Sequence, residues 1–281
     1  MSTVARALIP KDIASAMELS KAANWNQTPE DWRRVLQFGG EGCRCIEDAG
    51  RIAATASLVP YGTRLAWIGM VLTRPEYRRR GFAKQLMEDL VARAEDANIR
   101  TLKLDATSEG RPLYESLGFV VEEIVERWGL SLNAETQDRR GDNGQVTSTQ
   151  ISDDVFGMDE EAFGASRREL LETLSEAGKC SATMHGYVLS RSGASAEYLG
   201  PCVASSCAEA ELLIASHLAH NTNSDKPCDW YWDLLPANVA AASCAEKLGF
   251  TRRRTLWRMR RGEIMESNNA MVYAIAGFEW G

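Results

Sequence analysis

The chain has 281 residues, a formal net charge of −7, a hydrophobic share of 44% and a charged share of 25%. This composition is typical of a globular protein with a full core, and the length predicts two domains of ordinary size. The acidic balance argues against general affinity for nucleic acid, and no apolar run approaches the roughly 20 residues that span a bilayer. Only three histidines are present, which argues against a metal site. The seven scattered cysteines and the lack of an apolar leader predict a cytoplasmic protein with reduced thiols.

Helical spacing predicts two helices near the N-terminus, over residues 9–23 and 29–36, the second with Pro29 in its first turn. The pattern of residues 42–62 predicts a β-hairpin with its turn at 47–50. Strands and helices then alternate in the first half. We expect strands over 65–72, 101–106 and 119–131, and helices over 81–97 and 112–117. In the second half we expect one helix within 158–178 and a second hairpin over 185–203.

A basic turn joins the expected strand at 65–72 to the helix that follows it. Residues 77–83 read YRRRGFA. Backbone N–H groups at a helix start point outward and carry partial positive charge, so an anion docks there readily. Gly81 lets the backbone turn toward such a ligand, and Ala83 keeps side-chain bulk away from it. The segment predicts a pyrophosphate cradle formed by Arg78, Arg79, Arg80, Gly81, Phe82, Ala83 and Lys84.

The spacing Arg78-x-x-Gly81-x-Ala83 differs from the glycine patterns of dinucleotide and ATP loops. It resembles the acetyl-CoA loop of the GNAT superfamily of N-acetyltransferases. A later segment, LKLDATSEGRPLYESLGF, is similar to the superfamily's strand and helix that end in Tyr-x-x-x-Gly-Phe, here Tyr114 and the pair Gly118 and Phe119. The resemblance implies an α+β fold in which helices flank a mixed, twisted sheet, and it implies acetyl-CoA as the co-substrate.

The chain also contains an internal repeat. Three segments of the first half resemble three of the second in the same order: 66–72 and 197–203, 102–107 and 230–235, 116–128 and 247–259. This order indicates a tandem duplication. Residues 133–150 are polar and lack apolar periodicity, which is typical of a linker. We therefore expect two tandem GNAT-like domains: a catalytic domain over 1–135, a linker over 136–150 and a degenerate domain over 151–281.

The two copies differ at the positions where chemistry is expected. The second copy has no glycine or arginine in the segment that matches the cradle, and it carries Glu209 and Glu211 there. A carboxylate repels a pyrophosphate, so this cradle is expected to be empty. Ala245 stands opposite Tyr114. The resemblance is to tandem proteins whose second half serves architecture or acceptor binding.

The expected reaction assigns roles to a few further groups. The backbone of Met70, Val71 and Leu72 can pair with the pantetheine arm as an extra strand, and one N–H can polarise the thioester carbonyl. A thiol has a pKa near 8.5 and a phenol near 10, so Tyr114 is suited to protonate the leaving thiolate. Asp105 is a candidate general base, but its counterpart Asp233 in the second copy weakens that role, and the base stays unassigned.

The favoured function is transfer of acetyl from acetyl-CoA to a primary amine of a small molecule in a ternary complex. Two alternatives stay open, namely acetylation of protein lysines or N-termini and a non-catalytic acyl-CoA sensor. In the superfamily the segment that holds Trp25, Trp32 and Tyr61 faces the acceptor, although core packing is expected for at least two of them. The sequence identifies neither the amine nor the oligomeric state, and a homodimer stays open.

Overall fold

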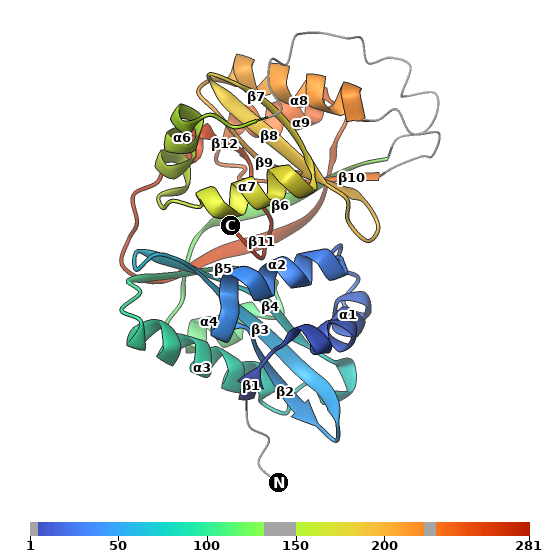
Figure 1. The fold of residues 1–281 in the computed structure, drawn as a ribbon, viewed down its shortest axis with the longest axis vertical. Coiled ribbons are helices and arrows are strands. Elements are labelled where there is room, and N and C mark those ends of the chain that lie inside the picture. Colours follow the sequence, from blue (N-terminus) through green and yellow to red (C-terminus); the bar gives the residue numbers. More distant parts are fainter. Residues whose placement is uncertain (1–4, 132–149, 222–228) are drawn as a thin grey trace. The chain divides into compact units, whose positions relative to one another are not determined.

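The computed structural model describes residues 5–131, 150–221 and 229–281, so that nearly all of the expected linker lies outside the described residues. The chain forms two compact units, coloured by sequence in Figure 1. The N-terminal unit comprises Met1–Glu122, Arg258–Ile264 and Phe278–Gly281, and the C-terminal unit comprises Glu123–Trp257 and Met265–Gly277. Within the described ranges, no helix is both long enough and apolar enough to cross a membrane.

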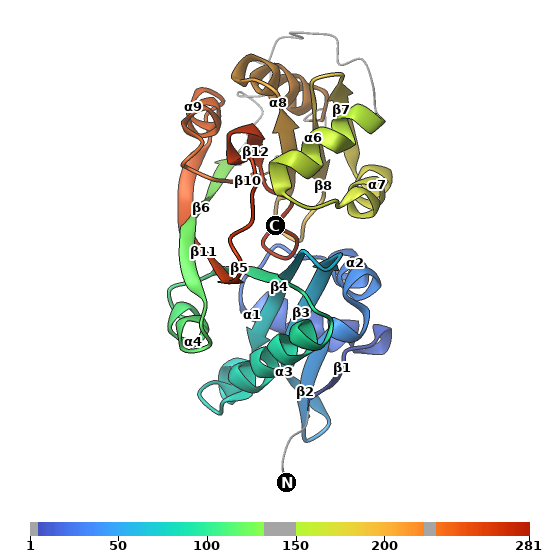
Figure 2. The same ribbon diagram turned by 90° about the vertical axis from the view of Figure 1, so that its left-hand side faces the viewer.

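The N-terminal unit is built on a sheet whose strands run in the order β1-β2-β3-β4-β5. Its strands are β1 (Ala5–Ala7), β2 (Arg44–Asp48), β3 (Arg51–Tyr61), β4 (Leu65–Thr73) and β5 (Thr101–Ala106). Its helices are α1 (Ile13–Ala22), α2 (Pro29–Gly39), α3 (Phe82–Asp96) and α4 (Arg111–Ser116). Neighbours from β1 to β4 pair antiparallel and β4 pairs with β5 parallel, which confirms the expected mixed sheet. Figure 2 shows α3 in front of β3 and β4 and α1 behind them, so both faces of this sheet are covered.

The start of α2 shows how local sequence fixes an element. Thr28 Oγ1 accepts a hydrogen bond from the Asp31 N–H at 3.2 Å, and Asp31 Oδ2 accepts one from the Thr28 N–H at 2.7 Å. This reciprocal cap satisfies two N–H groups, and Pro29 suits the first helical position. The helix then buries Trp32 completely, with its Nε1 donating to Ser20 Oγ at 3.0 Å. Trp32 therefore belongs to the core.

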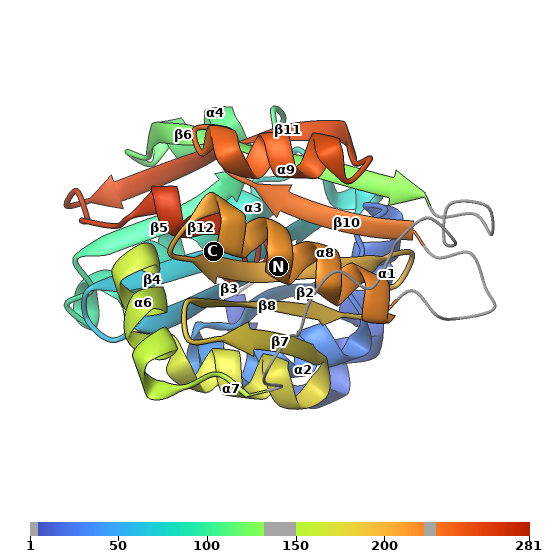
Figure 3. The same ribbon diagram turned by 90° about the horizontal axis from the view of Figure 1, so that it is seen from above.

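The C-terminal unit contains a sheet in the order β6-β10-β9-β8-β7, and β12 pairs with β9. Its strands are β6 (Val120–Ser131), β7 (Lys179–Thr183), β8 (Gly186–Arg191), β9 (Glu197–Ala204), β10 (Asp229–Leu234) and β12 (Val272–Ala274). Strand β11 (Thr251–Gly262) belongs to this unit as far as Trp257 and to the N-terminal unit from Arg258. Its helices are α6 (Asp153–Phe163), α7 (Arg168–Ala177), α8 (Cys207–Asn221) and α9 (Val239–Lys247). Figure 3 shows α8 lying along β8 and β9. Buried apolar residues of α8, β8 and β9 form one hydrophobic cluster with Trp230 and Trp232 of β10.

The prediction of a single helix within 158–178 is wrong. Helix α6 ends at Phe163, and a separate helix, α7, begins at Arg168. Gly164 follows in the left-handed region with φ of 90° and ends α6. A side chain there would place Cβ 2.5 Å from the Glu266 carbonyl oxygen, so only glycine fits. The short strand β7 was not predicted, since the sequence KCSAT lacks an apolar alternation. The hairpin over 185–203 is confirmed as the antiparallel pair β8 and β9.

The two copies of the repeat exchange their last strands. Asp105 of β5 accepts two hydrogen bonds from Arg258 of β11, at 2.9 and 3.0 Å. In the C-terminal unit, Asp233 of β10 accepts two from Arg127 of β6, at 2.7 and 2.6 Å. The repeat aligns Asp105 with Asp233 and Arg127 with Arg258. Each copy therefore supplies the aspartate of one pair and the arginine of the other.

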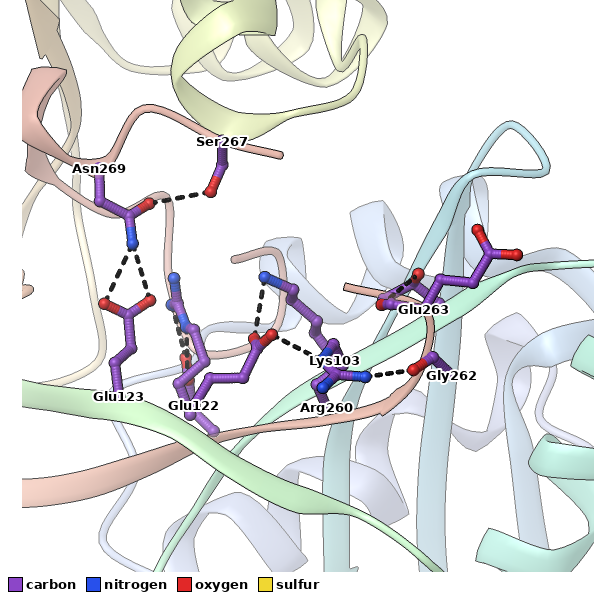
Figure 4. Close-up of polar contacts among 11 residues, drawn as sticks. Lys103, Glu122, Glu123, Arg260, Gly262, Glu263, Ser267 and Asn269 are labelled. Carbon is purple, nitrogen blue, oxygen red and sulfur yellow. Dashed lines mark hydrogen bonds and ion pairs between the residues drawn. The ribbon is translucent and has the colours of Figure 1, made fainter. Parts of the chain in front are cut away.

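A second ionic cluster ties the exchanged strand into the N-terminal unit (Figure 4). Glu122 binds Lys103 Nζ of β5 at 2.9 Å and Arg260 Nε of β11 at 2.8 Å. Lys103 is buried, so its charge requires this partner. In the C-terminal unit the neighbouring Glu123 accepts two hydrogen bonds from Asn269 Nδ2, both at 3.1 Å (Figure 4).

We expect Asp105→Asn to destabilise the N-terminal unit by about 3 kcal/mol, because it leaves the buried Arg258 charge without its carboxylate. Urea unfolding followed by tryptophan fluorescence measures this loss, since the Arg258 guanidinium lies 4.6 Å from the centre of the Trp67 ring. The control is Glu30→Gln, which breaks an exposed pair with Arg33 and should leave the unfolding midpoint nearly unchanged. Equal midpoints for the two variants would contradict the structural role of the pair.

Candidate active site

The N-terminus of α3 has the features that the cradle requires. Helix α3 begins at Phe82, directly after Gly81, whose φ of 83° lies in the left-handed region. No side chain caps this end and no acidic residue stands in its first turn. A Cβ built on Gly81 would have no atom within 4 Å, so the space in front of the loop is open. The first N–H groups of α3 can therefore bind an anion.

The seven residues proposed for the cradle differ in how their side chains are held. Phe82 is buried and packs against Tyr77 at 6.1 Å between ring centres, so its side chain anchors the helix start. The Arg80 guanidinium lies over the Tyr77 ring at 4.9 Å and 3.7 Å from Asp48, which holds it beside the loop. The side chains of Arg78, Arg79 and Lys84 are exposed too. The cradle thus presents four exposed cations, of which Arg80 lies against Tyr77 and Asp48.

Strand β4 carries a bulge at the position expected to meet the thioester. Its register against β3 shifts between Thr55 and Ser57, so that Met70 and Val71 together face the single residue between them. Met70 has φ of 49°, and its carbonyl accepts a hydrogen bond from Thr55 Oγ1 at 2.9 Å. The bulge re-aims the backbone at Met70 and Val71.

Beyond the start of β4, no ladder joins it to β5 in the described structure. The parallel ladder between these strands joins residues 65–67 with 101–103, whereas β4 stays paired with β3 as far as Thr73. Met70 and Leu72 are buried, and their backbone groups have no ladder partner on the β5 side of the described structure. An extended amide chain can add here as a further strand.

Tyr114 lies on α4, with its ring buried and 6.2 Å from the centre of the Phe119 ring. Burial raises the pKa of its hydroxyl above the ordinary value, because the charged form is poorly solvated there. Among the described residues, the Tyr114 hydroxyl has no hydrogen-bond partner. The side chain is therefore a protonated donor whose hydrogen is available to a ligand.

Asp105, a candidate general base, does not face solvent. Its side chain is completely buried and lies in the bidentate pair with Arg258. Tyr61, expected near the acceptor, is buried and donates its hydroxyl hydrogen to the Trp280 carbonyl at 2.7 Å. Trp25 is half-buried in the segment between α1 and α2.

Residues 278–281 complete this side of the N-terminal unit, and no sequence motif marks them. Trp67 Nε1 of β4 donates to the Phe278 carbonyl at 3.0 Å. Gln27 Nε2 donates to Glu279 Oε2 at 3.0 Å, and both side chains are buried. The only sequence signal is the acidic residue between two aromatic ones in FEWG, which is too short to predict a site.

The start of the corresponding helix of the C-terminal unit, α8, differs from that of α3. At the start of α8, Ser206 Oγ accepts a hydrogen bond from the Glu209 N–H at 3.2 Å. The Glu209 carboxylate accepts a hydrogen bond from Thr183 Oγ1, and Glu211 forms an ion pair with Lys247. Ala245 is buried in α9 and offers no hydroxyl. This helix start is capped by its own chain and carries negative charge, in contrast to that of α3.

Comparison with known proteins gives two family matches along the chain. Residues 13–119 match the model of the Acetyltransferase (GNAT) family, and residues 155–274 match that of an Acetyltransferase (GNAT) domain. Two curated proteins are similar in sequence. An uncharacterized N-acetyltransferase of Bacillus subtilis, YitH, is 27% identical over 59% of this chain and 57% of its own length. A holothin acyltransferase of Pseudoalteromonas is 24% identical over 94% of this chain and 90% of its own.

Solved structures share the fold over the whole length. A Pyrococcus horikoshii protein superimposes with a TM-score of 0.86 at 22% identity, covering 99% of this chain and 96% of its own. A tandem GNAT protein from the clavulanic acid biosynthesis pathway gives 0.68 at 14% identity, covering 93% and 98%. The expected α+β architecture of two tandem domains is confirmed.

Proposed function

Since the chain belongs to the GNAT acetyltransferase family and carries two GNAT domains in tandem, we propose that its N-terminal unit transfers acetyl from acetyl-CoA to a small primary amine. The observation that carries this proposal is the uncapped start of α3 behind three arginines, in the same unit as the bulged part of β4 that no ladder joins to β5 in the described structure. The relative named for holothin supports a small-molecule acceptor. The second copy of the repeat is then the degenerate half, and its last strand supplies Arg258 to the N-terminal unit.

The residues present fit the donor, since GNAT proteins use acyl-CoA. The N–H groups at the start of α3 would bind the pyrophosphate, with Arg78, Arg79, Arg80 and Lys84 adding charge. The backbone of Met70, Val71 and Leu72 would hold the pantetheine amides, and an N–H at the bulge would stabilise the oxyanion.

In the proposed reaction, the neutral amine nitrogen attacks the thioester carbonyl carbon. The new carbon–nitrogen bond forms, the carbon–sulfur bond breaks, and the nitrogen loses one proton. Tyr114 gives its hydroxyl proton to the departing sulfur and regains one from solvent. The phenol of Tyr114 is protonated at neutral pH, as this role requires, and burial raises its pKa further.

We expect one acetyl-CoA to bind per chain, because α3 presents an open N-terminus whereas Ser206 and Glu209 close that of α8. Titration calorimetry with acetyl-CoA measures the stoichiometry. Two equivalent sites per chain would contradict the assignment of the C-terminal unit as degenerate.

The function is tested by release of free CoA thiol from acetyl-CoA with a panel of pentylamine, spermidine, tyramine, glucosamine and a lysine peptide. We expect amine-dependent release with at least one small amine. Release with the lysine peptide alone would favour a protein acceptor. Tight acetyl-CoA binding without release for any amine would favour a sensor.

A further inference from the structure

Three buried polar atoms of the N-terminal unit lack partners, one on strand β3, one in the segment before α2 and one within residues 278–281. Gln27 Oε1, Ser57 Oγ and Trp280 Nε1 are buried and make no hydrogen bond in the described structure. The three residues are 8%, 1% and 0% exposed. A buried polar atom without a partner costs stability, so such a group points to a ligand that completes it.

Ser57 and Glu279, the hydrogen-bond partner of Gln27, lie beside the bulge of β4. Gly69 precedes Met70, and a Cβ built on it would lie 2.8 Å from Cα of Glu279, so glycine is needed for the close approach. Ser57 lies directly opposite Gly69 on β3. Side chains of opposed residues share one face of a sheet, which places Ser57 on the face that Glu279 covers.

We propose that Glu279, Gln27 and Ser57 bind the ammonium group of the acceptor, and that Glu279 removes its proton. This inference rests on the proposed acyl transfer, for which it supplies the acceptor site and the missing base. Gln27 must turn Nε2 toward the Glu279 carboxylate, which can only accept, so its Oε1 is left as an acceptor for the ligand.

The chemistry of the three groups matches a primary ammonium. The carboxylate of Glu279, the amide oxygen of Gln27 and the hydroxyl of Ser57 all accept hydrogen bonds, and an ammonium group has three N–H donors. Charge assistance from the carboxylate favours the cation over a neutral alcohol of the same shape. The ligand class is therefore a primary alkyl amine.

The proton transfers balance with the acyl transfer. The ammonium gives one proton to the Glu279 carboxylate, and the resulting amine forms the carbon–nitrogen bond while the carbon–sulfur bond breaks. The nitrogen then loses its second proton to solvent, and the sulfur takes one from Tyr114. Glu279 returns its proton to solvent before the next turnover.

The test compares the full chain with Glu279→Gln, which keeps the shape and removes the charge. We expect kcat/KM for the best amine of the panel to fall on the order of a hundredfold at neutral pH, with the Kd of acetyl-CoA unchanged. The remaining rate should climb with pH toward the amine's own pKa, because the free amine needs no base. The control Glu263→Gln changes an exposed glutamate of the same unit and should behave as the wild type.

Ser57→Ala separates a ligand site from a structural one. We expect KM for the amine to rise on the order of fivefold, while stability stays equal or increases, because the variant deletes a hydroxyl that has no partner. An unchanged KM, as expected if a bound water satisfies this hydroxyl, would overturn the site.

Calorimetry with spermidine in the presence of CoA gives a readout that is independent of turnover. Binding to the wild type that is lost in Glu279→Gln supports the ammonium site even if no amine releases thiol, in which case only the proposed function fails. Wild-type turnover with a Glu279→Gln rate within about twofold of it would overturn the site and leave the proposed function standing.

Discussion

Tyr114→Phe is expected to lower kcat on the order of a hundredfold and to leave the Kd of acetyl-CoA unchanged. The variant keeps the ring that packs against Phe119 and deletes only the hydroxyl. That hydroxyl has no partner among the described residues, so its loss leaves no other group unsatisfied. We therefore attribute the expected loss of kcat to slower protonation of the leaving thiolate. Steady-state thiol release and calorimetry measure the two quantities.

Tyr231→Phe is the matched control in the C-terminal unit. It also deletes a hydroxyl and keeps the ring on which the Arg127 guanidinium lies, at 4.9 Å. We expect its kcat to equal that of the wild type. A wild-type kcat for Tyr114→Phe as well would reduce Tyr114 to a packing residue.

Gly81→Asp should weaken acetyl-CoA binding on the order of a hundredfold, since a carboxylate then competes with the pyrophosphate for the N–H groups of α3. The position is open, so the new side chain meets no protein atom within 4 Å of its Cβ. It does carry backbone strain, because φ at this position is 83°. Calorimetry measures the change in Kd.

Gly62→Asp separates strain from charge. Gly62 has φ of 63° and nothing within 4 Å of a built Cβ, and it lies in the turn between β3 and β4. We expect this variant to bind acetyl-CoA as the wild type does. If both variants lose affinity equally, the effect at Gly81 is strain, and the cradle assignment fails.

The fold of the N-terminal unit follows closely from local sequence signals. The turn that precedes α3, the hairpin of β2 and β3 and the capped start of α2 are each encoded by neighbouring residues, so pattern and punctuation predict them. The bulge at Met70 has no such signal, because nothing in LAWIGMVL marks a residue with positive φ. It arises from pairing with β3, which sequence periodicity does not describe.

The exchange of β6 and β11 shows what the repeat cannot reveal. Internal similarity aligns Arg127 with Arg258, but it does not say which aspartate each arginine meets. The answer depends on contacts between residues 153 and 106 positions apart in the chain. The same holds for Glu279, which meets Gln27 across 252 positions. Long-range pairs of this kind form the parts of the candidate site that the motifs leave out.

The most direct test of a single acyl transfer in the N-terminal unit is mass spectrometry of both amine and protein after incubation with acetyl-CoA. The proposed direct attack predicts one acetyl group on the amine for each thiol released and an unchanged protein mass at steady state. It also predicts that Gly81→Asp, at an acetyl-CoA concentration near the wild-type Kd, lowers both products together. Acetylated protein during turnover, or thiol release without acetylated amine, would contradict the account.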